Sequence, residues 1–223
     1  MDLYIILATG NDDKVREVNE IASEYRNGPY RIHVLSMKAV GIDSDPDETG
    51  TTFAENARIK ARAVAGLIPS GDPDARRQWQ YSHGIEPEGE LIVVADDSGL
   101  VIDAMGGMPG IYSARYLGRD TSYSFKMNHI LEEMKDVPDE KRTARFVAAI
   151  AAVLPDGTCY DATGTMEGRI GHEICGANGF GYDPFFYLPA YGKTSAELQP
   201  DEKNKISHRG KGIRAMFDQL ERL

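Results

Sequence analysis

The chain has 223 residues, 41% of them hydrophobic, which suffices for one sizeable domain or a two-lobed one with a buried core. Its formal net charge of −10 argues against sequence-blind nucleic-acid binding, because such binding needs a basic surface. The apolar runs are shorter than the ~20 residues that span a bilayer, and "MDLYIILATG" lacks the basic flank of a signal peptide. We therefore expect a cytoplasmic protein that binds neither nucleic acid nor membrane.

The two cysteines of the chain are consistent with a cytoplasmic protein. Cys159 and Cys175 have no CxxC spacing, so neither a zinc site nor a disulfide framework is indicated. We expect two buried free thiols.

The first half of the chain alternates between predicted strands and helices. In order, these are a strand over 3–8, a helix with apolar residues at 15, 18, 21, 22 and 25, a strand over 32–37 and an acidic loop over 41–50. Thr52 and Glu55 then form a capping box for a helix whose apolar stripe runs from Phe53 to Ile68.

Residues 69–90 differ from their surroundings, because they are rich in proline, glycine and charge and have no apolar period. They include the only tryptophan, Trp79. This composition predicts an exposed, mobile insertion loop and not a linker between domains.

The second half again mixes the two kinds of element. We expect a strand opening with 91–95, a helix with its apolar face from Tyr123 to Met134, a long hairpin of 144–154 and 158–170 that turns at 155–157, and a final helix from near Ser207. Hairpin and crossover connections together predict an α/β fold, a mixed β-sheet flanked by helices.

Two carboxylates, Asp96 and Asp97, follow the apolar run "LIVVA". Side chains alternate along a strand, so the two acids are expected to point different ways, one holding position while the other works. A carboxylate at the C-terminal end of a strand suits Mg²⁺, which takes one or two carboxylates plus phosphate oxygens and water, and it can accept a proton from water. From this stretch alone, an ordinary Asp-Asp-Ser-Gly turn with two solvated acids explains the pattern as well as a metal or catalytic site does. The glycines that follow would permit a sharp turn or close approach of a ligand.

The turn "TGNDDK" (9–14) joins a predicted strand to a predicted helix, where free backbone N–H groups favour an anion. Thr9 and Asn11 add side-chain donors, and Lys14 adds a cation. This motif alone favours simple helix capping by Asn11 or Asp12 with Lys14 in solvent.

Aromatic residues stand among glycines in "GANGFGYDPFFY" (176–187). Phe180 or Tyr182 is a candidate to stack on a flat base, and Asp183 a candidate to accept from a ring N–H. Stacking gives affinity with little choice among bases, so specificity must come from polar contacts. The aromatics at 185–187 are expected to be core.

Basic residues gather in "DEKNKISHRGKG" (201–212), before the last helix. Its two glycines are poor helix formers, which suggests close approach to a ligand. Lys205 and Lys211 are expected to be solvated, whereas His208 and Arg209 are stronger candidates for a site.

Five stretches together resemble the inosine triphosphate pyrophosphatase family, in the family's order and over nearly the whole chain. They are "TGNDDK", "ETGTTFAENARIKA", "ADDSGLVIDAMGGMPGIYSARY", "GFGYDPFF" and "KNKISHRG". The resemblance implies a homodimer and one domain over 1–223, with an elongated mixed sheet in two lobes and a substrate cleft between them. It also implies Mg²⁺-dependent hydrolysis of ITP, dITP and XTP to monophosphate and pyrophosphate.

The resemblance also implies a role for each of several residues. The phosphates are assigned to Thr9, Gly10, Asn11, Asp12, Asp13, Lys14, Lys60 and Lys203. The metal is assigned to Glu48 and Asp97, with Asp97 also accepting the proton of the attacking water and Asp96 in support. Substrate and base contacts are assigned to Ser98, Phe180, Gly181, Tyr182, Asp183, His208 and Arg209.

The chemistry fits water attack at the α-phosphorus, because positioning and charge neutralisation supply most of phosphoryl-transfer catalysis. A donor such as Arg209 facing the 6-oxo group of inosine or xanthine would be left unpaired by adenine, at ~1–3 kcal/mol per stranded group. Compared with the family's bacterial pattern, residues 69–90 are additional, which leaves finer substrate preference open.

Two other functions stay open on the sequence. A nucleotide-binding sensor without turnover would use the same residues, although it has little reason to keep Glu48 and Asp97 beside a polyanion without a metal. An RNA-binding protein that stacks bases on 176–187 conflicts with the net charge of −10.

Overall fold

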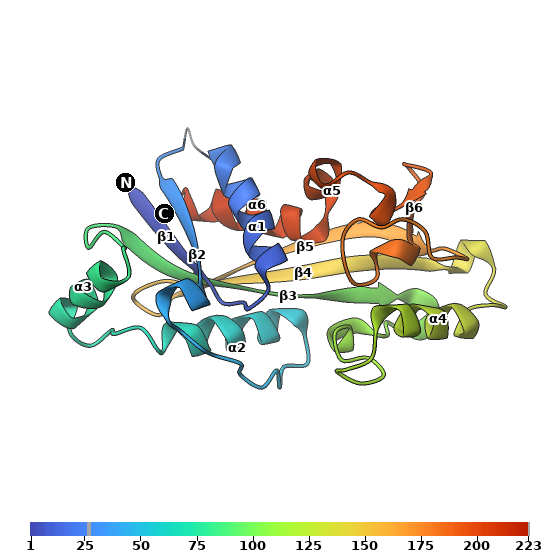
Figure 1. The fold of residues 1–223 in the computed structure, drawn as a ribbon, viewed down its shortest axis with the longest axis horizontal. Helices are drawn as coiled ribbons and strands as arrows, with labels where there is room; N and C mark the ends of the chain where they lie inside the picture. The colour runs from blue at the N-terminus through green and yellow to red at the C-terminus, as the bar shows by residue number, and fades with distance from the viewer. Residues whose placement is uncertain (26–27, 223) are drawn as a thin grey trace. The chain divides into compact units, whose positions relative to one another are not determined.

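The computed structural model describes residues 1–25 and 28–222 (Figure 1). Its strands form a seven-stranded sheet in the order β2-β1-β3-β4-β5-β6-β7. β1 pairs in parallel with β2 and β3, whereas β6 pairs antiparallel with β5 and β7. The prediction of a mixed sheet flanked by helices is confirmed.

The strands are β1 (Asp2–Leu7), β2 (Arg31–Ser36), β3 (Glu90–Ile102), β4 (Thr143–Val153), β5 (Cys159–Ile170), β6 (Phe186–Leu188) and β7 (Lys193–Thr194). The α-helices are α1 (Asp12–Ala22), α2 (Phe53–Ala65), α3 (Pro73–Ser82), α4 (Tyr123–Glu133), α5 (Pro200–Ile206) and α6 (His208–Leu220). No helix in the described part of the chain is long and apolar enough to cross a bilayer.

The chain divides into two compact units, which are described separately. Unit 1 comprises Met1–Asp97, Ala149–Thr163 and Gly212–Leu223, and unit 2 comprises Ser98–Ala148 and Gly164–Lys211. Strand β3 contributes to both units, and the division between them falls between Asp97 and Ser98.

Unit 1 has its core between α2 and one face of the sheet (Figure 1). The α2 residues Ala57, Ala61 and Val64 are at most 1% exposed and pack against Val93 and Ala95 of β3. Thr52 caps α2, its Oγ1 accepting from Glu55 N (3.1 Å), as predicted. Glu55 Oε2 in turn accepts from Thr51 N (2.7 Å), one residue before the cap.

α1 is joined to the C-terminal part of α6 within unit 1. Tyr25, just after α1, lies edge-on to Phe217 with ring centroids 5.2 Å apart, and its hydroxyl donates to Arg214 O (3.2 Å). Arg214 in turn pairs with Glu24 (2.7 Å). These contacts hold α1, and with it Lys14, in place.

Residues 69–90 are not a structureless loop, because they contain α3. Asp72 caps this helix by accepting from Asp74 N and Ala75 N, and Pro73 occupies its first position. At the other end Gly84 has φ +70°, and Ile85 N donates back to Gln80 O (2.9 Å), a Schellman ending. Most of the segment is exposed, as expected, but Gln80 and Ile85 are buried, and Trp79 packs on the unit 1 core. The expectation of a loop was wrong because capping and these few anchors replace an apolar stripe.

β3 also departs from expectation, since it continues through both acids to Ile102. Ser98 and Gly99 stay extended because Leu100 and Ile102, both fully buried, anchor the strand in the unit 2 core. The sharp turn comes later, where Gly106 and Gly107 have φ +63° and +92°. Pairing with β1 stops at Val94, so the acids lie just beyond the end of β1 and in the middle of β3.

Unit 2 packs α4 and the 185–188 region on its part of the sheet. Phe185 and Phe186 are fully buried, which confirms them as core, whereas Tyr187, also expected to be core, is only partly buried. Arg142, 1% exposed, donates to Met134 O (2.6 Å), Ile170 O (2.9 Å) and Gly171 O (2.6 Å), and so ties the end of α4 to the end of β5.

Three smaller outcomes concern the rest of the chain. The long hairpin of β4 and β5 is confirmed, with Leu154 N donating to Thr158 O (2.9 Å) across its turn. The final helix starts at His208, as expected, but the short α5 before it was not predicted. Cys159 and Cys175 are free thiols that are partly exposed, not buried.

Candidate functional site

Unit 1 gathers two lysines and three carboxylates, which we call the lysine–carboxylate cluster: Lys14, Glu48, Lys60, Asp96 and Asp97. Lys14 Nζ of α1 donates to Asp96 Oδ1 (2.9 Å), and Lys60 Nζ of α2 donates to Asp97 Oδ1 (2.8 Å). The two neighbouring acids thus meet different helices, because consecutive strand residues face opposite sides of the sheet. The predicted divergence of Asp96 and Asp97 is confirmed.

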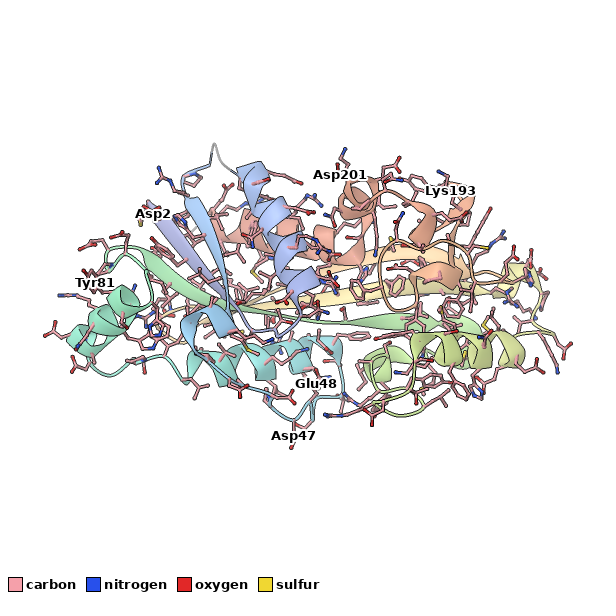
Figure 2. All side chains as sticks on the ribbon, viewed as in Figure 1. Asp2, Asp47, Glu48, Tyr81, Lys193 and Asp201 are labelled. Carbon is pink, nitrogen blue, oxygen red and sulfur yellow. The ribbon has the colours of Figure 1, made fainter. Side chains whose placement is uncertain are left out.

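Glu48 joins the cluster from the acidic loop that leads into α2 (Figure 2). Its Oε1 accepts from Lys60 Nζ (3.0 Å), so one ammonium group lies between the carboxylates of Glu48 and Asp97. All three side chains are largely shielded from solvent. Two carboxylates separated by 49 residues are therefore directed at one cation.

Asn56 belongs to this group, although the sequence interpretation omitted it. It is fully buried, accepts from Gly50 N (2.9 Å) and donates to Asp97 Oδ2 (3.3 Å). It connects the "DETG" loop to the acid strand and fixes the second oxygen of Asp97. Its sequence signal is a polar residue one helical turn before Lys60, beside the apolar stripe of α2.

Burial and charge shift the pKa values of the central pair. Burial raises the pKa of the Asp97 carboxyl, and the nearby Glu48 charge adds to this, while Lys60 and Asn56 oppose it. Burial lowers the pKa of Lys60, but the charges of Asp97, Asp96 and Glu48 outweigh this effect and raise it. Lys60 therefore stays charged, and Asp97 is more basic than an exposed aspartate.

The residues fit a divalent cation that also binds substrate. Among the described residues there is no group of three or more His, Cys, Asp or Glu side chains arranged as a metal cage. Glu48 and Asp97 nevertheless converge on one ammonium, and Mg²⁺ takes one or two carboxylates and completes its shell with phosphate oxygens and water. The donor set matches that requirement.

The turn at 9–14 caps α1. Asn11 Oδ1 accepts from Asp13 N (2.9 Å) and Lys14 N (3.3 Å), and Thr9 Oγ1 accepts from Asn11 N (3.2 Å). Gly10 and Asp12 are exposed, and Asp13 pairs with Arg16. Helix capping by Asn11 is thus present, but Lys14 points to Asp96 and not into solvent.

Unit 2 holds a second group, which we call the aromatic–cation cluster: Phe180, Asp183, Ser195, Lys203 and Arg209. Asp183, only 2% exposed, accepts from Lys203 Nζ (2.6 Å), Ser195 Oγ (2.8 Å) and Phe180 N (2.8 Å). Ser195 was not predicted, and nothing in its sequence surroundings indicates this role.

Gly179 is required where the chain passes this pair. Its φ is +76°, and an added Cβ would collide with Asp183 Oδ2 and lie 2.9 Å from Lys203 Nζ. Gly181 also has a positive φ, of +68°. The glycines of "GANGFGYD" therefore allow a tight loop around a buried carboxylate.

Phe180 is 37% exposed and has two cations near its ring, Lys203 Nζ at 5.2 Å and Arg209 Cζ at 5.4 Å from the ring centroid. Arg209 also donates to Ser98 Oγ (3.2 Å). An exposed ring beside polar groups of fixed position is a surface on which a flat base can stack.

Tyr182 cannot offer such a surface. It is 3% exposed, donates to Ser113 O (3.0 Å) and stacks on Phe185. The choice between Phe180 and Tyr182 for stacking thus narrows to Phe180. His208, also buried, stacks on Phe146 at 4.9 Å.

Sequence-predicted residues therefore fall into two groups. Unit 1 brings the 9–14 turn and Lys60 to the acids Glu48, Asp96 and Asp97. Unit 2 brings together Ser98, Phe180, Asp183, Lys203 and Arg209. Lys203, expected with the phosphate residues, is bonded within the second group.

The chain belongs to the Ham1 family, because the model of that family matches residues 5–219. The dITP/XTP pyrophosphatase of Clostridium perfringens is 41% identical over 216 residues, 97% of this chain and 96% of that protein. The dITP/XTP pyrophosphatase of Escherichia coli (strain K12) is 40% identical over 218 residues, 97% of each chain.

Solved structures of other Ham1 proteins have the same fold as this chain. The Staphylococcus aureus Ham1 protein matches with a TM-score of 0.77 and 34% identity, covering 98% of both chains. A Ham1 protein from Coxiella burnetii matches with a TM-score of 0.78 and 34% identity, covering 99% of this chain and 100% of that one.

Proposed function

We propose that this protein is a nucleoside triphosphate pyrophosphatase that converts ITP, dITP and XTP to the monophosphate and pyrophosphate. Relatives at about 40% identity over almost the whole chain carry the name dITP/XTP pyrophosphatase. The observation that carries the proposal is the convergence of Glu48 and Asp97 on Lys60. A protein that only bound a polyanion would gain nothing from two carboxylates at that position, one buried (Asp97) and one partly buried (Glu48).

The triphosphate is assigned to unit 1. Lys14 and Lys60 neutralise phosphate oxygens, and the backbone of the 9–14 turn adds N–H donors at the start of α1. Glu48 and Asp97 would hold Mg²⁺, which, when bound, supplies further neutralisation of the phosphates. Asp96 holds Lys14 in position through their 2.9 Å bond.

Asp97 is assigned as the proton acceptor for the attacking water. Burial makes its carboxylate more basic than an exposed one, and Asn56 holds its second oxygen. Attack at the α-phosphorus breaks its bond to the bridging oxygen, so the β- and γ-phosphates leave together as pyrophosphate.

The base is assigned to unit 2, with Phe180 as its stacking surface. Arg209 donates to the 6-oxo group of hypoxanthine or xanthine, and adenine, which has an amine there, leaves this donor unpaired. Each stranded group costs ~1–3 kcal/mol, so two such mismatches reject ATP by on the order of a thousandfold. Ser98, Gly181 and His208 complete the proposed base contacts, while Asp183 positions Lys203.

We infer from the family that the enzyme is a cytoplasmic homodimer, acting where the nucleotide pool is found. Its molecular mass in solution, measured by sedimentation, is expected to be twice the 24.6 kDa of one chain.

A nucleotide panel tests the proposed function. Purified protein with Mg²⁺ is incubated with ITP, dITP, XTP, GTP and ATP, and both pyrophosphate and orthophosphate are measured over time. We expect pyrophosphate from the first three and far less from GTP or ATP. Orthophosphate as the first product would contradict attack at the α-phosphorus, and no product after prolonged incubation would favour a sensor.

A further inference from the structure

Unit 1 contains a cavity of about 430 Å³ beside α3, which we call the α3 cavity. Its lining comes from the end of α2, from residues 68–76, from the start of β3 and from the turn after β4. The volume lies within the ~300–1,000 Å³ usual for small-molecule sites. The segment 69–90 thus contributes to a cavity that the proposed reaction does not use.

The α3 cavity is separate from the lysine–carboxylate cluster, although both touch α2 and β3. Arg62 lines the cavity and follows Lys60 by two residues, so the two side chains leave the helix about 200° apart. Val93, another lining residue, precedes Asp97 by four residues, about 13 Å along the strand.

Two arginines supply the positive charge of the cavity, Arg62 from α2 and Arg76 from α3. Two other arginines of the same helices, Arg58 of α2 and Arg77 of α3, are paired with Asp161 and Asp74. Neither Arg62 nor Arg76 has such a carboxylate within 4.0 Å among residues 1–25 and 28–222.

Arg76 is also partly withdrawn from water. Burial lowers the pKa of its guanidinium, and its Nη2 donates to Leu91 O over a long distance of 3.4 Å. A desolvated cation with no counter-charge is stabilised when an anion binds beside it. Asp156 also lines the cavity, and its Oδ1 already accepts from Thr158 N (2.8 Å).

Apolar side chains form much of the remaining wall, notably Ile68, Val93, Val153, Leu154 and Pro155. A bare inorganic ion would leave this wall in contact with water. A ligand with one charged group and an apolar body would cover it.

We propose that the α3 cavity binds a small organic anion, a carboxylate or phosphate monoester, whose charged group meets Arg62 and Arg76 and whose apolar body lies on Val93, Val153 and Leu154. The site is distinct from the nucleotide site and does not depend on the proposed reaction.

Trp79 provides a reporter for this site. It is the only tryptophan of the chain, it follows Arg76 by three residues on α3, and it packs on the unit 1 core. Residues three apart on a helix share a face, so an anion held by Arg76 changes the surroundings of the indole.

The experiment titrates the full-length protein with phenyl phosphate and, separately, with sodium benzoate, following Trp79 fluorescence and the heat of binding by calorimetry. We expect saturable binding of at least one probe. Arg62→Gln and Arg76→Gln should each weaken it by about tenfold or more, because a charge-assisted hydrogen bond is lost. Arg77→Gln, the matched control, should bind like wild type.

The two probes and inorganic phosphate separate the ligand sources. Tighter binding of phenyl phosphate indicates a phosphate monoester, and tighter binding of benzoate a carboxylate. Inorganic phosphate should bind about tenfold more weakly than phenyl phosphate, and equal affinity would overturn the proposed class.

Three results would overturn the site itself. These are no saturation by either probe up to about 10 mM in both measurements, binding unchanged in Arg62→Gln and Arg76→Gln, or an equal loss in Arg77→Gln. Thermal unfolding of each variant, with Tm close to wild type, shows that any loss of binding is not a loss of folding.

Discussion

Two buried aspartates, each bonded to a lysine, have different surroundings in the two units. In unit 1 Asp97 shares Lys60 with a second acid, Glu48, and the lysine–carboxylate cluster holds three carboxylates against two ammonium groups. In unit 2 Asp183 faces no second acid within the aromatic–cation cluster and accepts from three donors, Lys203, Ser195 and Phe180 N.

This difference shows that a buried Asp–Lys pair does not by itself indicate a catalytic or a structural role. The surplus negative charge around Asp97 favours another cation, whereas the donors around Asp183 already occupy both of its oxygens. We therefore assign Asp97 to chemistry and Asp183 to holding Lys203 and the Phe180 loop in place. The predictions below test this contrast, from the largest expected effect to the smallest.

Asp97→Asn should lower kcat for ITP about a thousandfold, because the amide cannot accept the proton of the attacking water. Asn is nearly isosteric and retains one acceptor oxygen for Lys60, so nucleotide binding should persist. Steady-state kinetics and calorimetric titration with ITP measure the two effects. Unchanged turnover would remove Asp97 from the mechanism.

Asp183→Asn should act mainly on stability. It leaves the buried Lys203 ammonium without its counter-charge, which costs about 3–5 kcal/mol. For a chain of this length that loss corresponds to a Tm lower by about 10 °C. Differential scanning calorimetry measures it, with the exposed Asp201→Asn on α5 as control (Figure 2). A Tm equal to that of the control would show that Asp183 is not an anchor.

Glu48→Gln should raise the Mg²⁺ concentration for half-maximal activity by about tenfold, because metal affinity follows the number of charged ligands. At saturating Mg²⁺ the kcat should recover most of its wild-type value. Its neighbour Asp47, exposed on the same loop, gives the control Asp47→Asn (Figure 2). The same Mg²⁺ dependence in both variants would argue against Glu48 as a ligand.

Ser195→Ala should have the smallest effect, a loss of about 1 kcal/mol in the free energy of unfolding. Asp183 keeps Lys203 and Phe180 N, so the ion pair survives. Urea unfolding measures the loss, and KM for ITP should stay close to wild type. A large rise in KM would mean that Ser195 contributes to the base contacts and not only to the position of Asp183.

Helix α2 shows where sequence interpretation succeeds, and helix α3 shows where it fails. α2 has a capping residue, Thr52, and a regular apolar stripe that packs on the sheet, so its pattern predicts it directly. α3 has equally good ends, at Asp72–Pro73 and Gly84–Ile85, but Gln80 is its single buried residue. The capping signals were in the sequence, and the absence of an apolar period concealed them.

The candidate site shows a similar limit. The residue types and their order point to phosphate, metal and base binding through the family resemblance. The position of Lys203 beside Asp183, the burial of Tyr182 and the part played by Asn56 could not be deduced from local patterns.

By itself, the sequence determined the mixed α/β fold and the main strands and helices, because periodicity and capping are properties of neighbouring residues. It also determined membership of the family, because the motifs and their order can be read along the chain. Tertiary structure alone decided which group each acid meets. Lys14 and Asp96 are 82 residues apart, and Lys203 and Asp183 are 20 apart. Contacts at such separations depend on how strands and helices pack. The same packing explains why β3 continues past Asp96 and Asp97, because Leu100 and Ile102 are buried in the unit 2 core.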